Sequence, residues 1–123
     1  LRTSTNGGGS YDSGGSDYEA QNHFSVGNTE GGSRFSGSYI RITGSGIGNG
    51  ANESCSGSIR IYSPSSAGRT QTTHEAGYYN TLGDYSQSVG SGLRVSATAI
   101  DALQVVMNTG NIDSGTFKLY GYK

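Results

Sequence analysis

The most regular feature of the chain is a period-two alternation of apolar and polar residues in several short runs. Each run holds two aliphatic or phenylalanine side chains two positions apart with polar residues around them, namely Ile40 and Ile42, Ile59 and Ile61, Leu93 and Val95, and Phe117 and Leu119. This spacing is typical of a β-strand that buries only one of its faces. The alternation predicts strands at residues 35–43, 58–62, 92–97 and 116–122.

Residues 102–107, Ala-Leu-Gln-Val-Val-Met, form the most continuously apolar run. Two consecutive valines favour a strand over a helix here, so the run predicts a central strand. Residues 111–115 are rich in asparagine, serine and glycine, which are turn-forming residues. We therefore expect residues 116–122 to fold back along this strand, with Phe117 and Leu119 facing the core.

Glycine- and asparagine-rich segments at residues 44–50, 64–68 and 108–115 separate these runs. Both residue types accept the positive φ angles that tight turns require. Several short strands joined by such turns, with no convincing helix, predict an all-β chain of seven to nine strands. We expect an antiparallel β-sandwich, with jelly roll as its topology.

The beginning of the chain has a different composition. Residues 3–16 consist of glycine, serine, threonine, asparagine and aspartate, with Tyr11 as the single apolar side chain. Such a stretch buries too little apolar area to offset the entropy lost on ordering. We expect a flexible N-terminal arm or linker over residues 1–17 and one β-sandwich domain over residues 18–123.

Composition narrows the class of protein further. The 123 residues include 22 glycines and few aliphatic residues, but the net charge is only −1 and nine tyrosines add apolar area. These values favour a folded domain with a thin core over a disordered chain. No apolar run approaches the roughly 18 residues of a membrane-spanning helix, so we expect no membrane insertion. The basic residues are scattered, which argues against a nucleic-acid partner.

No spacing of reactive side chains predicts catalysis or metal binding. Most acidic residues lie in glycine- and serine-rich segments, where a carboxylate is ordinarily solvated. His23 and His74 lack partners at the spacings of zinc sites, and no Gly-x-Ser-x-Gly elbow is present. The single cysteine, Cys55, is expected to be a small, half-buried residue. We therefore expect a protein that is not an enzyme and that uses no cofactor or metal.

Tyrosine is the one enriched residue type that indicates a binding surface. Three tyrosines flank a segment rich in glycine, asparagine and aspartate, and tyrosine offers large contact area together with a hydroxyl group. An equally weighted alternative is that several of these rings complete a core that is short of leucine. The candidate partner- or glycan-binding residues are Tyr78, Tyr79, Asn80, Asp84 and Tyr85.

Two segments carry motifs that resemble a known module. Residues 56–66, Ser-Gly-Ser-Ile-Arg-Ile-Tyr-Ser-Pro-Ser-Ser, form a strand pattern that ends in a Pro-Ser-Ser turn. Residues 110–123 end the chain with Gly-Asn-Ile-Asp-Ser-Gly-Thr-Phe-Lys-Leu-Tyr-Gly-Tyr-Lys. Together they resemble a β-sandwich module of virion proteins of tailed bacteriophages, over residues 18–123. Tyr122 departs mildly from the module, which usually has isoleucine or leucine before the final lysine.

The module occurs in capsid decoration (cement) proteins and in tail or head fibres. The resemblance therefore implies a non-enzymatic structural protein, made in the host cytoplasm, that decorates the virion surface and stabilises the head. It implies the major capsid protein or other virion subunits as partners and a homo-oligomer, with a trimer favoured. It carries no catalytic residue. The alternative is a receptor- or carbohydrate-binding domain of a tail fibre or spike that recognises a host-surface glycan.

Overall fold

A computed structural model describes residues 1–122 of the chain. They contain seven strands and no helix, and every strand pair is antiparallel. The strands are β1 (Arg2–Ser4), β2 (Tyr18–Val26), β3 (Thr29–Gly37), β4 (Cys55–Tyr62), β5 (Gln71–Tyr79), β6 (Tyr85–Arg94) and β7 (Ala102–Gln104). The all-β, antiparallel fold class is confirmed.

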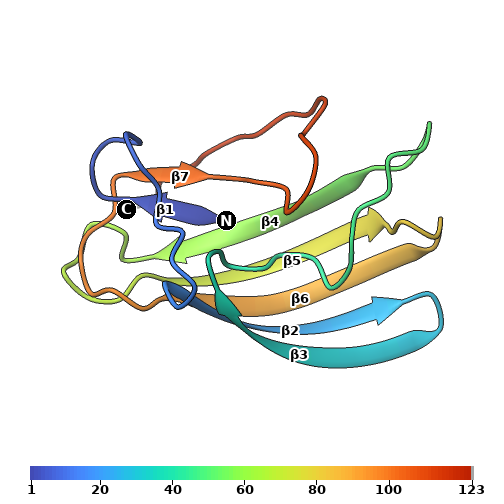
Figure 1. Cartoon of the computed structure of the whole chain (residues 1–123), viewed down its shortest axis with the longest axis horizontal. Helices are drawn as coiled ribbons and strands as arrows, with labels where there is room; N and C mark the ends of the chain where they lie inside the picture. The colour runs from blue at the N-terminus through green and yellow to red at the C-terminus, as the bar shows by residue number, and fades with distance from the viewer. Residues whose placement is uncertain (123) are drawn as a thin grey trace.

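The strands form two sheets of unequal size. Five strands lie side by side in the order β3-β2-β6-β5-β4, and β1 pairs with β7 in a separate two-stranded sheet (Figure 1). Gly27 and Asn28 join β2 to β3, because Val26 pairs with Thr29. Gly27 has a φ of 56°, as the first central residue of a type II′ hairpin turn requires. The large sheet leaves β3 and β4 as its two edges.

One face of the large sheet is covered and the other is open to solvent. Along β5 and β6 buried and exposed residues alternate almost perfectly, as expected of strands with one covered face. The core cluster on the covered face consists of Leu1, Tyr18, Ala20 and Ile40, with partly buried side chains such as Leu103 packed against it. The cover therefore comes from the two-stranded sheet and from the segment that follows β3.

Two glycines of β6 let the cover approach the sheet closely. A Cβ atom at Gly92 would lie 2.9 Å from Oγ1 of Thr72 and would also collide with the side chain of Ile40. A Cβ atom at Gly90 would lie 2.7 Å from Nε2 of His74. The absence of side chains at Gly90 and Gly92 thus leaves room for Ile40 and for the buried side chains of Asn22 and His74.

The C-terminal part of the chain does not form the expected hairpin. Of the strand expected at residues 102–107, only Ala102–Gln104 is present, and it pairs with β1 at the margin of the fold. Residues 116–122 form no strand, and the side chains of Phe117 and Leu119 are 67% and 83% exposed. The prediction that these two residues face the core is wrong. Alternation of apolar and polar residues indicates that a segment can form a strand, but it does not identify the strand with which the segment pairs.

The other expected strands agree with the structure to different degrees. The strand predicted at residues 58–62 lies within β4, and the one at 92–97 overlaps the end of β6. The strand predicted at 35–43 overlaps β3 only at residues 35–37. The alternation of aliphatic residues does not identify β2 and β5, because threonine, asparagine and histidine occupy much of their buried face.

The N-terminal residues belong to the fold. Leu1, Thr3 and Ser4 are buried, and the backbones of Leu1 and Ile40 exchange two hydrogen bonds of 2.8 Å each. We expected a flexible arm over residues 1–17, but its first four residues are ordered in the fold. The pairing of β1 with β7 and the bonds between Leu1 and Ile40 hold them in place. The flexibility of the arm beyond them stays a prediction.

A partly buried ion pair joins the loop after β1 to the large sheet. Nε of Arg94 lies 2.6 Å from Oδ2 of Asp12, and the exposed fractions of the two side chains are 5% and 32%. The Tyr18 hydroxyl accepts a 2.8 Å hydrogen bond from the backbone N–H of Thr3, and it lies 3.3 Å from the carbonyl oxygen of Asp12. Asp12 is thus not the solvated loop acid that its surroundings in the sequence suggest.

Replacing Asp12 tests this pair. We expect Asp12→Ala to lower the free energy of unfolding by about 2 kcal/mol, the range for a hydrogen bond to a charged group, because Arg94 would remain buried without its carboxylate. Glu19→Ala removes the exposed pair with Arg34 (3.5 Å) and should cost about 0.5 kcal/mol or less. Urea denaturation of both variants measures the difference. Equal losses would show that the burial of Arg94 does not matter.

Candidate functional site

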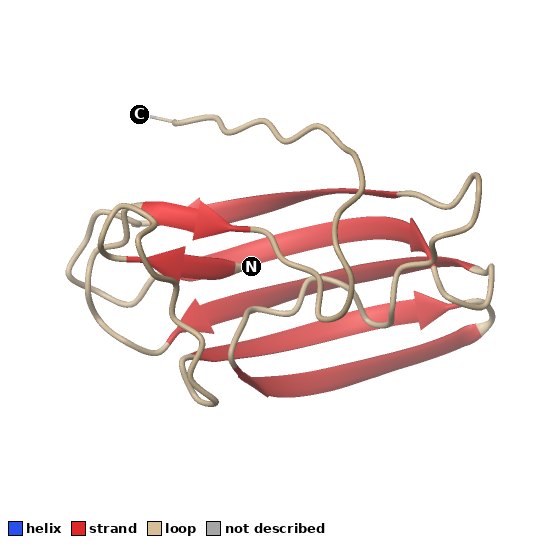
Figure 2. Cartoon of the chain, turned by 45° about the horizontal axis from the view of Figure 1, so that its top comes forward, coloured by secondary structure: helices blue, strands red, loops and turns tan. Residues whose placement is uncertain are grey.

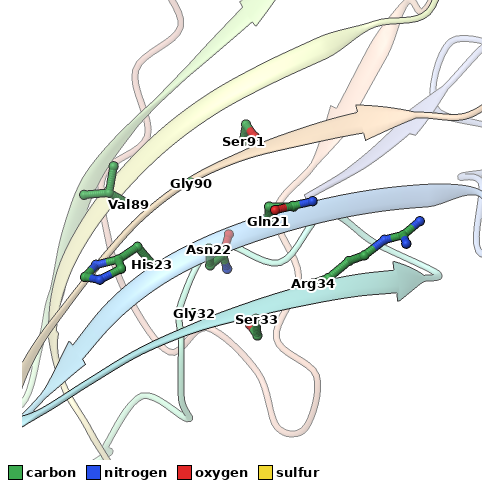
Figure 3. Close-up of a pocket in the computed structure, with 9 residues that line it drawn as sticks. All are labelled: Gln21, Asn22, His23, Gly32, Ser33, Arg34, Val89, Gly90 and Ser91. Carbon is green, nitrogen blue, oxygen red and sulfur yellow. The ribbon is translucent and has the colours of Figure 1, made fainter.

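The open face of the large sheet carries the exposed side chains of its strands. Strand register sets its side chains in rows: His23 lies opposite Val89 and Gly32, and Gln21 lies opposite Ser91 and Arg34. A shallow depression of about 470 Å³ runs along β2, β3 and β6 at these rows (Figure 3). Its lining residues are Gln21, Asn22, His23, Gly32, Ser33, Arg34, Val89, Gly90 and Ser91.

The depression offers hydrogen-bonding groups around one apolar side chain. Arg34, Gln21 and Ser91 supply a guanidinium, an amide and a hydroxyl, and Val89 is exposed among them. Sites for small molecules and cofactors normally enclose most of the ligand surface. Since this hollow lies in the open face of the sheet, it suits contact with an extended partner better than with an enclosed cofactor.

Two of the candidate tyrosines lie at one end of the same face. Tyr79 and Tyr85 are directly opposite each other in the β5–β6 pair. Their rings meet edge to face, with centroids 5.6 Å apart and an interplanar angle of 71°. Both rings are exposed, and the exposed Asp84 precedes Tyr85 in the turn. The structure thus brings Tyr79 and Tyr85 together on the surface, and Asp84 is exposed next to Tyr85 in the sequence.

The other two candidates are buried and build the turn itself. The Tyr78 hydroxyl accepts a 3.0 Å hydrogen bond from the backbone N–H of Ser45, on the covered side of the sheet. Oδ1 of Asn80 accepts bonds from the backbone N–H groups of Leu82 (2.8 Å) and Asp84 (3.0 Å). Tyr78 therefore has the core role that the alternative interpretation described, and Asn80 shapes the turn that presents Asp84 and Tyr85.

A buried polar pair lies on the covered face, behind the depression. Nε2 of His74 is 3.0 Å from Oδ1 of Asn22, whose Nδ2 donates to the carbonyl oxygen of Arg41 at 3.2 Å. Because the amide nitrogen of Asn22 is used in this way, its oxygen faces the ring and Nε2 carries the hydrogen. The ring's Nδ1 has no hydrogen-bond partner among residues 1–122. Burial lowers the pKa of His74, so its ring is neutral at neutral pH.

The lowered pKa makes stability depend on pH. Unfolding returns the His74 pKa to its ordinary value of about 6.5, so the unfolded chain binds a proton at a higher pH than the folded chain does. The stability that neutral His74 contributes is therefore complete above that value and is lost as pH falls below it. We expect the midpoint of urea unfolding to fall between about pH 7 and pH 5, where histidine titrates.

The variants His74→Gln and His23→Gln separate the source of this dependence. The first should flatten the fall of the midpoint between these pH values, because it removes the buried titrating ring. The second replaces an exposed histidine of the open face and should leave the fall as it is. If His74→Gln kept the full pH dependence, another group would be responsible.

Cys55 differs from expectation, because it is exposed at the start of edge strand β4. Desolvation nevertheless raises the pKa of its thiol, which keeps it protonated at neutral pH. Within residues 1–122 no group of three or more histidine, cysteine, aspartate or glutamate side chains is placed to hold a metal ion. The same residues include no helix that is long and apolar enough to cross a membrane.

Comparisons of the chain with protein-family models, curated protein sequences and solved structures find no match. The similarity to phage virion modules therefore rests on the sequence motifs alone and stays a prediction.

Proposed function

We propose that the chain is a non-enzymatic structural module of a tailed-bacteriophage virion, namely a capsid decoration protein that stabilises the head. The observation that carries this proposal is the exposure of the C-terminal motif. Its apolar and aromatic side chains, Phe117, Leu119, Tyr120 and Tyr122, are all largely exposed. Soluble monomers rarely leave so many neighbouring apolar side chains in water, whereas a subunit of an assembly buries them against its neighbours.

The proposal includes the finer features that the resemblance implies. The chain would be made in the host cytoplasm and would join the particle through the major capsid protein or other virion subunits, as a homo-oligomer, with a trimer favoured. Its two sheets would form a β-sandwich of the jelly-roll type. A jelly roll has eight strands, and residues 116–122 would supply one more than the seven that the described part of the chain forms.

Quantitative mass spectrometry of purified particles tests the proposal. A decoration protein should be present at a copy number comparable with that of the major capsid protein. Dissociating the chain from the particles should lower the temperature at which the heads open. Particles that contain no copies of the chain would contradict the proposal, and a handful of copies per particle would favour a fibre or spike instead.

The alternative is a glycan-binding domain of a tail fibre or spike, and the exposed pair Tyr79 and Tyr85 with Asp84 favours it. Aromatic faces can stack on a sugar ring, and tyrosine hydroxyls and an exposed carboxylate can form hydrogen bonds with the sugar hydroxyls.

In that case the isolated chain should bind host-surface polysaccharide on a glycan array. Tyr85→Ala should weaken the binding about tenfold, as expected for the loss of one aromatic contact. Tyr62→Ala is the matched control, because Tyr62 is an exposed tyrosine of the same face on β4. Equal losses in both variants, or no binding by the unaltered chain, would exclude this site as a glycan site.

A further inference from the structure

Residues 116–122 have the pattern of a strand but pair with no strand among residues 1–122. Phe117 and Leu119 alternate with Lys118, Tyr120 and Tyr122, and threonine and aromatic residues favour extended backbone. Figure 2 shows the segment as an extended loop that runs apart from both sheets. A run with these properties gains most when another strand satisfies its backbone groups and covers its apolar side.

Strand β4 is an open edge that could receive it. β4 pairs with β5 in unbroken register from Cys55↔Tyr78 to Tyr62↔Gln71, and residues 1–122 place no strand on its other side. Natural edge strands are usually protected by several charges, a proline or a bulge. β4 has one charged residue, Arg60, and neither a proline nor a bulge. Ile59 and Ile61 remain only half-buried at this margin.

The opposite edge is less suited to pairing. β3 carries two charged residues, Glu30 and Arg34, and glycines within the strand, which weaken strand pairing. Its apolar residue, Phe35, already packs against Tyr39 with ring centroids 4.8 Å apart. β4 therefore offers the better edge in both backbone and side chains.

We propose that residues 116–122 of one copy of this chain add as a strand to β4 of a second copy. This inference rests on the proposed function as an assembly module and specifies how its copies are joined. The segment has almost the length of β4, which spans eight residues. Backbone hydrogen bonds would supply affinity, and alternate side chains would supply specificity, as in other cases of strand addition.

Charge favours one antiparallel register. With Phe117 opposite Ile59, Lys118 lies opposite Ser58, whose hydroxyl donates to Oε1 of Glu75 at 3.1 Å. The lysine then approaches a carboxylate. A shift of two residues would instead set Lys118 opposite Arg60, and like charges in direct opposition destabilise a sheet.

In the favoured register Leu119 lies opposite Gly57, and Gly121 lies opposite Cys55. The apolar side of the donated strand thus continues the side of β4 that carries Ile59. Tyr120 and Tyr122 extend the open face of the sheet beyond β4.

Size-exclusion chromatography with light scattering on the full chain tests the pairing. Leu119→Asp should reduce the mass to that of the monomer, because it places a charge on the apolar side of the donated strand. Leu82→Asp is the matched control, since Leu82 and Leu119 are both 83% exposed and Leu82 lies in the β5–β6 turn. Circular dichroism should be unchanged in both variants. If the unaltered chain is a monomer, or if both variants dissociate alike, the inference is overturned.

Cross-linking through Cys55 tests the register. In Gly121→Cys, oxidised glutathione should accept the two electrons and two protons that a pair of thiols releases and so join Cys55 of one copy to position 121 of another. Tyr122→Cys places the thiol on the other side of the strand and should cross-link far less. Cys55→Ser should abolish the product. No intermolecular product at position 121, equal products at 121 and 122, or a disulfide within one chain would each overturn the inference.

The two proposals fail separately. A chain that self-associates and cross-links as described but is absent from purified particles contradicts the virion function and leaves strand donation intact. A chain that decorates particles but remains a monomer without cross-links contradicts strand donation and leaves the virion function intact.

Discussion

The fold depends on how closely its covering layer can approach the five-stranded sheet. Ile40 can reach the sheet because Gly92 has no side chain, and Leu1 is held beside Ile40 by two backbone hydrogen bonds. Large apolar side chains are scarce on the covered face, so the layers must be close for the few that exist to be in contact. The Arg94–Asp12 pair secures the loop that brings this layer into place.

The covered face of the sheet is largely polar. His74 and Asn22 satisfy each other in part, but the hydroxyls of Thr72 and Ser88 are buried without a hydrogen-bond partner among residues 1–122. A buried polar group without a partner costs about 1–3 kcal/mol. The covered face therefore contributes less to stability than an aliphatic face of the same area would.

This polar interior also explains how far the fold could be predicted from the sequence. β4 is identified correctly because Ile59 and Ile61 mark its covered side. In β5 the buried side carries Thr72 and His74, and those residue types do not distinguish a buried face from a solvated one. The role of β1 is equally hidden, because β1 depends on backbone pairing with β7, close to the other end of the chain.

The candidate site shows the same limit at the level of single residues. Successive residues on a strand point to opposite faces, so Tyr78 and Tyr79 lie on opposite faces of the sheet once β5 is known to include both. Which of them is buried depends on what covers the sheet, namely Ser45 above Tyr78. Asp12 is a similar case, because nothing near it in the sequence indicates that Arg94 is its partner.

In the proposed strand addition, residues 116–122 are the donor segment and β4 is the edge that receives it. These are different surfaces of the same chain, which limits the kinds of assembly that the copies can form. Such a contact is heterologous, because each copy uses one surface to donate and a different surface to receive. Copies therefore add one after another until the rotation between neighbours closes a ring. Two copies close it by exchanging segments, and three close it as a ring in which each copy donates to the next. Residues 105–115 join β7 to the donor segment, and their conformation sets the direction in which the segment leaves its own domain. The closed ring of three agrees with the trimer that the motif resemblance implies, and in either closed form no β4 edge remains open to further addition.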